Sequence, residues 1–129
     1  MKKLTLVLSS GEHEKLHMAG MLASVASVSA VPVDVFITMN ALLRFKKGIS
    51  PEERYVGKEL SPTIRGASGP DFVELFRQGR DLGEMKIYAC SAGLDIANLN
   101  EDDLEEMFDG VIGISKFLEL AEGSEIVFI

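Results

Sequence analysis

The chain has 129 residues, enough for one domain with a buried hydrophobic core, so we expect a single domain over residues 1–129. Its formal net charge of −7 argues against nucleic acid and anionic membranes as partners, because both are bound through basic surfaces. The single cysteine cannot form an internal disulfide, and neither a signal peptide nor a long apolar run is visible. We therefore expect a protein of the cytoplasm.

The hydrophobic pattern predicts strands and helices that alternate along the chain. In chain order we expect a strand at residues 4–8, a helix at 12–30, a strand at 31–38, a helix at 40–47, an irregular segment at 49–69, a helix at 71–80, a strand at 85–89, a helical turn at 93–97, a helix at 100–108, a strand at 110–113, a helix at 114–121 and a strand at 126–129. Short apolar strands separated by helices are typical of a parallel sheet that is covered on both faces. The predicted fold is a three-layer α/β/α domain with a mostly parallel, five-stranded sheet.

Cys90 is the only cysteine, and it follows the strand expected at residues 85–89 directly. Sites in open parallel sheets form beyond the carboxyl ends of the strands, so we expect the thiol to lie at an open crevice. The small residues Ser91 and Gly93 follow, and backbone N–H groups at a helix start would stabilise a thiolate. From position alone, a reactive cysteine and a buried structural one remain equal alternatives.

His13 and His17 form the pattern H-E-x-x-H, which in zinc peptidases binds the metal on one helix face. The chain has no third histidine, and this motif lies at a helix start, so we expect neither a bound metal nor another cofactor. One alternative is a solvated helix start that carries two histidines. In another, the loop after the first strand neighbours the loop after a central strand. That arrangement would place His13 or His17 beside Cys90, as a catalytic partner that stabilises the thiolate or moves a proton.

Two segments are candidates for contact with a ligand. The turn that contains Ser10 and Gly11 lacks the glycine-rich phosphate-binding motifs, so a plain strand-to-helix turn is favoured over an anion site. The segment at 49–69 is rich in proline and glycine, and we expect it to be mobile and to cover the cysteine crevice. The residues predicted to contact a ligand are Ser10, Gly11, Tyr55, Arg65, Ser91 and Gly93.

Several short stretches resemble one known family when they are taken together. They are Lys86-Ile87-Tyr88-Ala89-Cys90-Ser91-Ala92-Gly93-Leu94-Asp95, Asp102-Asp103-Leu104, Asp109-Gly110-Val111-Ile112-Gly113, the Ser-Ser-Gly after the first strand, and Phe36-Ile37-Thr38. In this order they resemble DsrE/DsrF-like proteins, which are small sulfur-relay domains, some of them called peroxiredoxin-like. The resemblance implies the family's DsrEFH-like fold, a cysteine that carries a persulfide, and a homotrimer or hexamer.

The sequence as a whole therefore predicts a sulfur carrier or sulfurtransferase-like protein that relays sulfane sulfur through Cys90. Its partners would be sulfur donor and acceptor proteins or small thiols. A peroxiredoxin cycle would need an external thiol, because no second cysteine exists to form an intramolecular disulfide. The alternative is a non-catalytic oligomeric module that binds a small ligand or a partner in the same crevice, with an inert cysteine.

Overall fold

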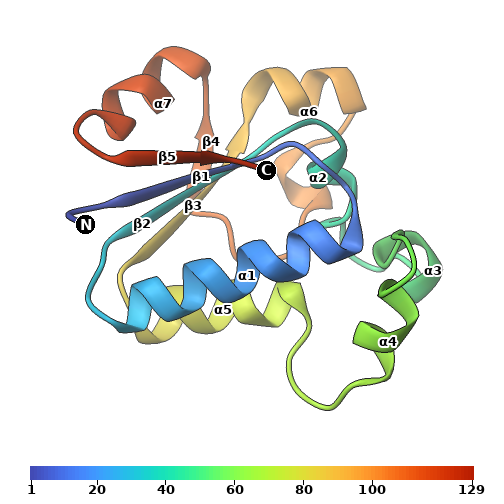
Figure 1. Ribbon diagram of the computed structural model, residues 1–129. Helices are drawn as coiled ribbons and strands as arrows, with labels where there is room; N and C mark the ends of the chain where they lie inside the picture. Colours follow the sequence, from blue (N-terminus) through green and yellow to red (C-terminus); the bar gives the residue numbers. More distant parts are fainter.

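The computed structural model describes residues 1–129, and Figure 1 shows the arrangement of its elements. In chain order these are β1 (Leu4–Leu8), α1 (His13–Val28), β2 (Val33–Ile37), α2 (Met39–Leu43), α3 (Pro51–Arg54), α4 (Ser61–Gly66), α5 (Phe72–Leu82), β3 (Met85–Cys90), α6 (Ser91–Ala97), a 3₁₀ turn (Glu101–Asp103), β4 (Gly110–Ile112), α7 (Ile114–Ala121) and β5 (Glu125–Phe128). None of the helices combines the length and the apolar character that a membrane span needs.

The five strands form one sheet in the order β4-β3-β2-β1-β5, and every neighbouring pair is parallel. Helices α1 and α5 lie together on one side of this sheet, and α7 lies on the other side (Figure 1). The predicted α/β fold is confirmed. The last strand, β5, pairs with the first, so that Leu4 lies opposite Glu125. Ser9 N–H then donates a hydrogen bond of 2.8 Å to the carbonyl of Ile129.

The alternation of side chains along the strands divides the core into two clusters. The larger cluster lies on the α1 and α5 side and takes alternate strand residues such as Leu6, Val35 and Ile87. The smaller cluster lies on the α7 side and consists of Val7, Phe36, Cys90, Phe117 and Ala121. The sulfur of the only cysteine is therefore part of the smaller cluster.

The segment at 49–69 contains two short helices, where the sequence predicted an irregular segment. Ser50 caps α3 by accepting a hydrogen bond of 3.2 Å from the N–H of Glu53, and Pro51 occupies the first helical position. In α4, Pro62 is the second helical residue and also lies in the first turn. Both helices begin at a Ser-Pro pair, a start signal that the proline and glycine content of the segment obscured.

The prediction of a helix over residues 100–108 is wrong, because only the 3₁₀ turn at the beginning of this segment forms. Leu104 instead makes an antiparallel bridge to Lys46. The N–H of Glu105 donates to the carbonyl of Phe45 at 2.8 Å, and the neighbouring backbone groups pair with the same segment. These long-range hydrogen bonds take the groups that a helix would have used.

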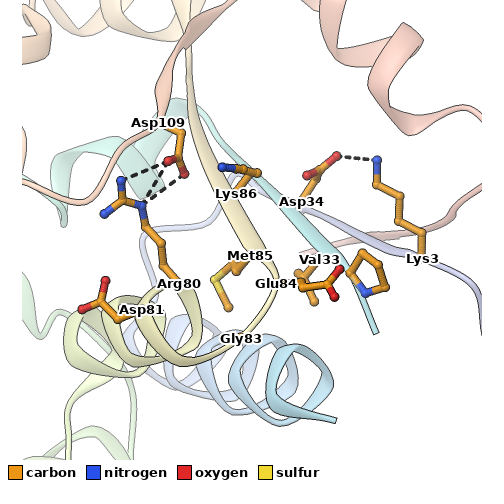
Figure 2. A pocket seen from close by; sticks show the side chains of 11 residues that line it. Lys3, Val33, Asp34, Arg80, Asp81, Gly83, Glu84, Met85, Lys86 and Asp109 are labelled. Atoms are coloured by element: carbon orange, nitrogen blue, oxygen red, sulfur yellow. Dashed lines mark hydrogen bonds and ion pairs between the residues drawn. The ribbon is translucent and has the colours of Figure 1, made fainter. Parts of the chain in front are cut away.

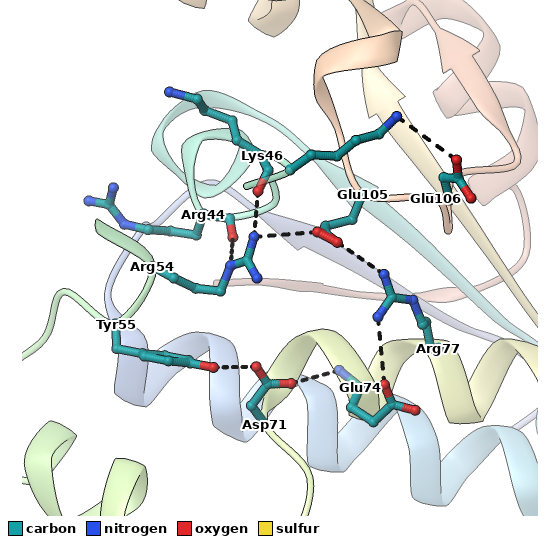
Figure 3. Close-up of polar contacts among 10 residues, drawn as sticks. Arg44, Lys46, Arg54, Tyr55, Asp71, Glu74, Arg77, Glu105 and Glu106 are labelled. Carbon is teal, nitrogen blue, oxygen red and sulfur yellow. Dashed lines mark hydrogen bonds and ion pairs between the residues drawn. The ribbon is translucent and has the colours of Figure 1, made fainter. Parts of the chain in front are cut away.

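Glu105 is also the centre of a network of arginines, which Figure 3 shows. Its carboxylate lies 3.1 Å from the guanidinium of Arg77 on α5 and 3.5 Å from that of Arg54 on α3. The guanidinium of Arg54 also donates to the carbonyls of Arg44 and Lys46. One half-buried carboxylate thus fixes α3, α5 and the turn after α2 relative to each other.

Candidate functional site

Cys90 is the last residue of β3 and the N-cap of α6. Its Sγ accepts a hydrogen bond of 3.3 Å from the backbone N–H of Gly93, in the first turn of α6. A cap of this kind places a sulfur where a helix start favours negative charge. The predicted position at a strand end, with small residues after it, is therefore the position that the structure has.

The thiol is not open to a crevice as expected, because the side chain of Cys90 is only 1% exposed. Cys90 shares its side of the sheet with Phe36, and both lie under α7. The ring of Phe117 on α7 stacks on that of Phe36 with ring centroids 4.4 Å apart, and Ile112 lies beside Cys90 on the neighbouring strand. Cys90 therefore lies in the cluster that packs beneath α7, and the closed structure leaves almost none of its surface open to a reagent.

Position 93 requires a glycine, because α6 approaches the turn after β2 too closely there for a side chain. A Cβ at this position would lie 2.8 Å from Cδ1 of Leu42 and 3.0 Å from Oγ1 of Thr38. In the same turn Met39 has a left-handed backbone with φ of +49°, a conformation that costs a non-glycine residue about 1–3 kcal/mol. Such strain is common at functional sites, and here it lies at the carboxyl end of the strand next to β3.

Two further residues predicted to contact a ligand lie at the carboxyl end of β1. The hydroxyl of Ser10 accepts a hydrogen bond of 3.1 Å from the N–H of Glu12, and the carbonyl of Gly11 accepts one of 3.0 Å from Nε of Arg44. Together with Asn40 they line a shallow hollow of about 410 Å³. The chain's own groups occupy this turn, which favours the interpretation as a plain strand-to-helix connection. Ser91, in contrast, lies half-buried beside Cys90 at the start of α6.

The histidines are not brought to Cys90, because α1 lies on the opposite side of the sheet. His13 is buried, and its Nδ1 lies 2.6 Å from the hydroxyl of Ser61 on α4. Its ring packs against those of Tyr55, at a centroid distance of 4.8 Å, and Phe72, at 5.9 Å. Burial lowers the pKa of His13 below 6.5, and the neighbouring His17 lowers it further. No group of three or more His, Cys, Asp or Glu side chains is placed to hold a metal ion.

Tyr55 and Arg65 also lie with the histidines and not with the cysteine. The hydroxyl of Tyr55 donates a hydrogen bond to the carboxylate of Asp71, and burial together with this bond raises the pKa of Tyr55 to about 12. The guanidinium of Arg65 lies 5.5 Å from the centre of the Tyr55 ring. The segment at 49–69 therefore covers the start of α1, and not the cysteine as expected. Sequence reasoning missed Ser61 and Asp71, although Asp71 before an apolar stretch is a helix N-cap signal.

A charged hollow of about 680 Å³ lies at the other end of the sheet, at the amino ends of the strands (Figure 2). Lys3 pairs with Asp34 at 2.6 Å, and Arg80 pairs with Asp109 at 3.0 Å. Lys86 on β3 lies between these two ion pairs in Figure 2. Sites in parallel sheets form at the carboxyl ends, and most charges here are already paired, so we interpret this hollow as structural.

A parallel five-stranded sheet with helices on both sides and a cysteine at the end of an inner strand defines a class of small α/β proteins. The family model for the DsrE/DsrF-like family matches residues 2–128, and the chain therefore belongs to this family, which is associated with sulfur relay.

Two solved structures share the fold over 100% of both chains. They are MTH1491 from Methanobacterium thermoautotrophicum, a protein of unknown function with 15% identity and a TM-score of 0.65, and the ychN protein from E. coli, with 12% identity and a TM-score of 0.67. At these identities the likeness shows the fold alone. No curated protein matches the chain.

Proposed function

We propose that this protein is a sulfur carrier, or a sulfurtransferase-like protein, in which Cys90 holds sulfane sulfur as a persulfide. The observation that carries the proposal is the hydrogen bond from Gly93 N–H to the sulfur of the only cysteine, at the carboxyl end of β3. This cap stabilises negative charge on Sγ, and a thiolate is the nucleophile of persulfide exchange. Family membership supports the same chemistry.

The proposed reaction needs no oxidant and no cofactor. The thiolate of Cys90 attacks the outer sulfur of a donor persulfide, R–S–SH, and the donor's S–S bond breaks. The donor leaves as a thiolate and takes the proton that Cys90 lost, so that R–SH and a Cys90 persulfide result. An acceptor thiolate then attacks the outer sulfur, and Cys90 is released. Donor and acceptor are proteins or small thiols, and such exchange fits a reducing compartment such as the cytoplasm.

Transfer requires that the cover over Cys90 opens. Helix α7 has eight residues, and only Phe117 and Ala121 are buried within it. It connects the edge strand β4 to the edge strand β5, so its displacement leaves the three inner strands paired. An opening of this small unit takes less free energy than unfolding of the domain, because few apolar contacts hold it.

Intact-mass measurement after exposure of the native protein to polysulfide tests the proposal. We expect a mass increase of one sulfur atom, localised to Cys90, that is lost when a small thiol is added as acceptor. Cys90→Ser is the matched control and should gain no sulfur, since the chain contains no other cysteine. A native protein that gains no sulfur, while the urea-unfolded protein does, would reject the carrier.

The second candidate is the non-catalytic module with an inert cysteine. The burial of Cys90 in an apolar cluster favours it, because structural cysteines are commonly buried in this way. The two candidates differ in native thiol chemistry. The module predicts no reaction of Cys90 with polysulfide or with an alkylating reagent below the unfolding transition.

We also propose that the working unit is a homo-oligomer, a trimer or a hexamer. Apolar side chains of the edge strand β5 are exposed, with Ile126 at 52% and Phe128 at 71%. Leu118 on α7 is exposed on the same side of the sheet. Apolar groups gathered at one edge favour a subunit contact. Sedimentation equilibrium at micromolar concentration should show the oligomer, and a monomer would contradict the proposal.

A further inference from the structure

A second pocket, of about 560 Å³, lies between the first half of α1, the α3–α4 segment and the start of α5. It is on the α1 side of the sheet, and the side chain of Cys90 is on the other. Its polar lining includes His13, His17, Tyr55, Arg65 and Asp71, and its apolar lining includes Met21, Ile64 and Leu75. Its volume is that of a pocket for a small organic molecule.

The hydrogen bonds of Ser61 define which nitrogen of His13 is available to a ligand. The Ser61 hydroxyl lies 3.3 Å from the carbonyl of Tyr55, which can only accept, and 2.6 Å from Nδ1 of His13. Both bonds form together only if the hydroxyl donates to the carbonyl and Nδ1–H donates to the hydroxyl. The neutral ring of His13 then carries a free lone pair on Nε2, which accepts a hydrogen bond from a ligand.

His17 also lines the pocket, one turn further along α1. Its Nδ1 is fully buried and has no hydrogen-bond partner. A buried polar atom without a partner is costly, so such atoms in folded proteins generally have one.

The lining contains one cation, Arg65, whose guanidinium is available to an anion. Arg65 has one ionic partner, Glu52, at 3.8 Å, and that carboxylate is 76% exposed, so water screens the pair. The one carboxylate in the lining, Asp71, already accepts from Tyr55 and from the N–H of Glu74. The guanidinium is therefore the charge that remains open to a ligand, and it binds carboxylates in a two-point geometry.

We propose that this pocket binds a small organic acid, with its carboxylate on Arg65, its apolar body against Ile64 and Leu75, and a hydroxyl or amine donor on Nε2 of His13. The site is separate from the persulfide chemistry of Cys90 and does not depend on it. It gives the protein a binding function in addition to the proposed sulfur transfer.

Proton NMR of the imidazole rings tests the site, because the chain contains only two histidines and both line the pocket. The probe is 4-hydroxybenzoate, which combines a carboxylate, an apolar ring and a hydroxyl donor. We expect a saturable shift of both rings at millimolar concentration. The neutral isostere 4-hydroxybenzamide should bind about 10- to 100-fold more weakly, because it lacks the charge that Arg65 pairs with.

Variants separate the site from nonspecific charge and from the cysteine. Arg65→Gln should weaken binding of 4-hydroxybenzoate by the same factor. Lys15→Gln removes one positive charge from the exposed side of α1 and should leave binding unchanged. Cys90→Ala should also bind as the wild type does, whether or not the cysteine takes up sulfur. Absence of a saturable shift, or equal binding of benzoate and benzamide by the wild-type protein, would overturn the proposal.

Discussion

Removal of the aromatic ring of Phe117, which belongs to the same buried cluster as Cys90, should increase the reactivity of the thiol strongly. Phe117 is 8% exposed and stacks on Phe36 at 4.4 Å, within a cluster of five buried residues. Truncation of a buried phenylalanine to alanine typically lowers the free energy of unfolding by about 3–5 kcal/mol. The surrounding cluster is small and lies under a short helix that can settle, so we expect about 3 kcal/mol, at the lower end of that range.

The same ring holds α7 in the closed position, so its loss should lower the free energy of local opening by a similar amount. A decrease of about 3 kcal/mol corresponds to roughly a 100-fold increase in the fraction of molecules in which Cys90 is accessible. The alkylation rate of the native protein with iodoacetamide should rise by that factor. A domain of this size, with a typical stability of about 5–15 kcal/mol, stays folded after the substitution.

Phe76→Ala is the matched control, because Phe76 is fully buried in the larger cluster on the other side of the sheet. It should lower the free energy of unfolding, measured in urea, by a similar amount. Alkylation well below the unfolding transition should change little. Equal acceleration in both variants would mean that Cys90 is reached by global unfolding. Loss of stability in Phe117→Ala without faster alkylation would mean that α7 does not control access.

Three further predictions concern the other sites. Folding lowers the pKa of His13 below 6.5, so below this pH the unfolded chain binds more protons than the folded one. The free energy of unfolding in urea should therefore decrease as the pH falls from 6.5 to the lower folded pKa. His13→Gln should remove this pH dependence, and His17→Gln should retain part of it. Tyr55 should ionise with a pKa of about 12 in an ultraviolet titration, and Tyr55→Phe should delete that transition; ionisation near 10 would refute the contact with Asp71. Gly93→Ala should lower stability by about 1–3 kcal/mol, because its Cβ would lie 2.8 Å from the side chain of Leu42, whereas Gly66→Ala, with open space around it, should change stability little.

The sequence was sufficient to predict the sheet, because short apolar runs such as residues 4–8 and 85–89 have few alternatives to a buried parallel strand. It was also sufficient to predict that Cys90 ends such a strand. It did not determine on which side of the sheet the thiol lies. That depends on the alternation of side chains along β3 and on the side that α7 covers, and both are properties of the whole fold.

The same reason explains why the sequence did not determine where the histidines lie relative to Cys90. The helix predicted over residues 12–30 follows from the sequence, but its position on the α1 and α5 side, away from Cys90, is set by the crossover from β1 to β2. The acidic stretch at 100–108 shows the limit of local propensity. Its residues favour a helix start, yet pairing of Leu104 and Glu105 with a segment more than fifty residues earlier decides its structure.

The pairing of β1 with β5 has a consequence for how the chain reaches this fold during synthesis. Strand β1 is made before the other strands of the sheet; β2 lies on one side of it, but its other neighbour is β5, which is made after all of them, with Leu4 opposite Glu125. Until β5 is made, β1 has a free edge that can pair with another chain. Contacts between the two ends of a sequence also form slowly, because a long loop must close first. A nascent or truncated chain that stops before Ser124 should therefore be prone to aggregation, because the four residues of β5 that pair with β1 are missing.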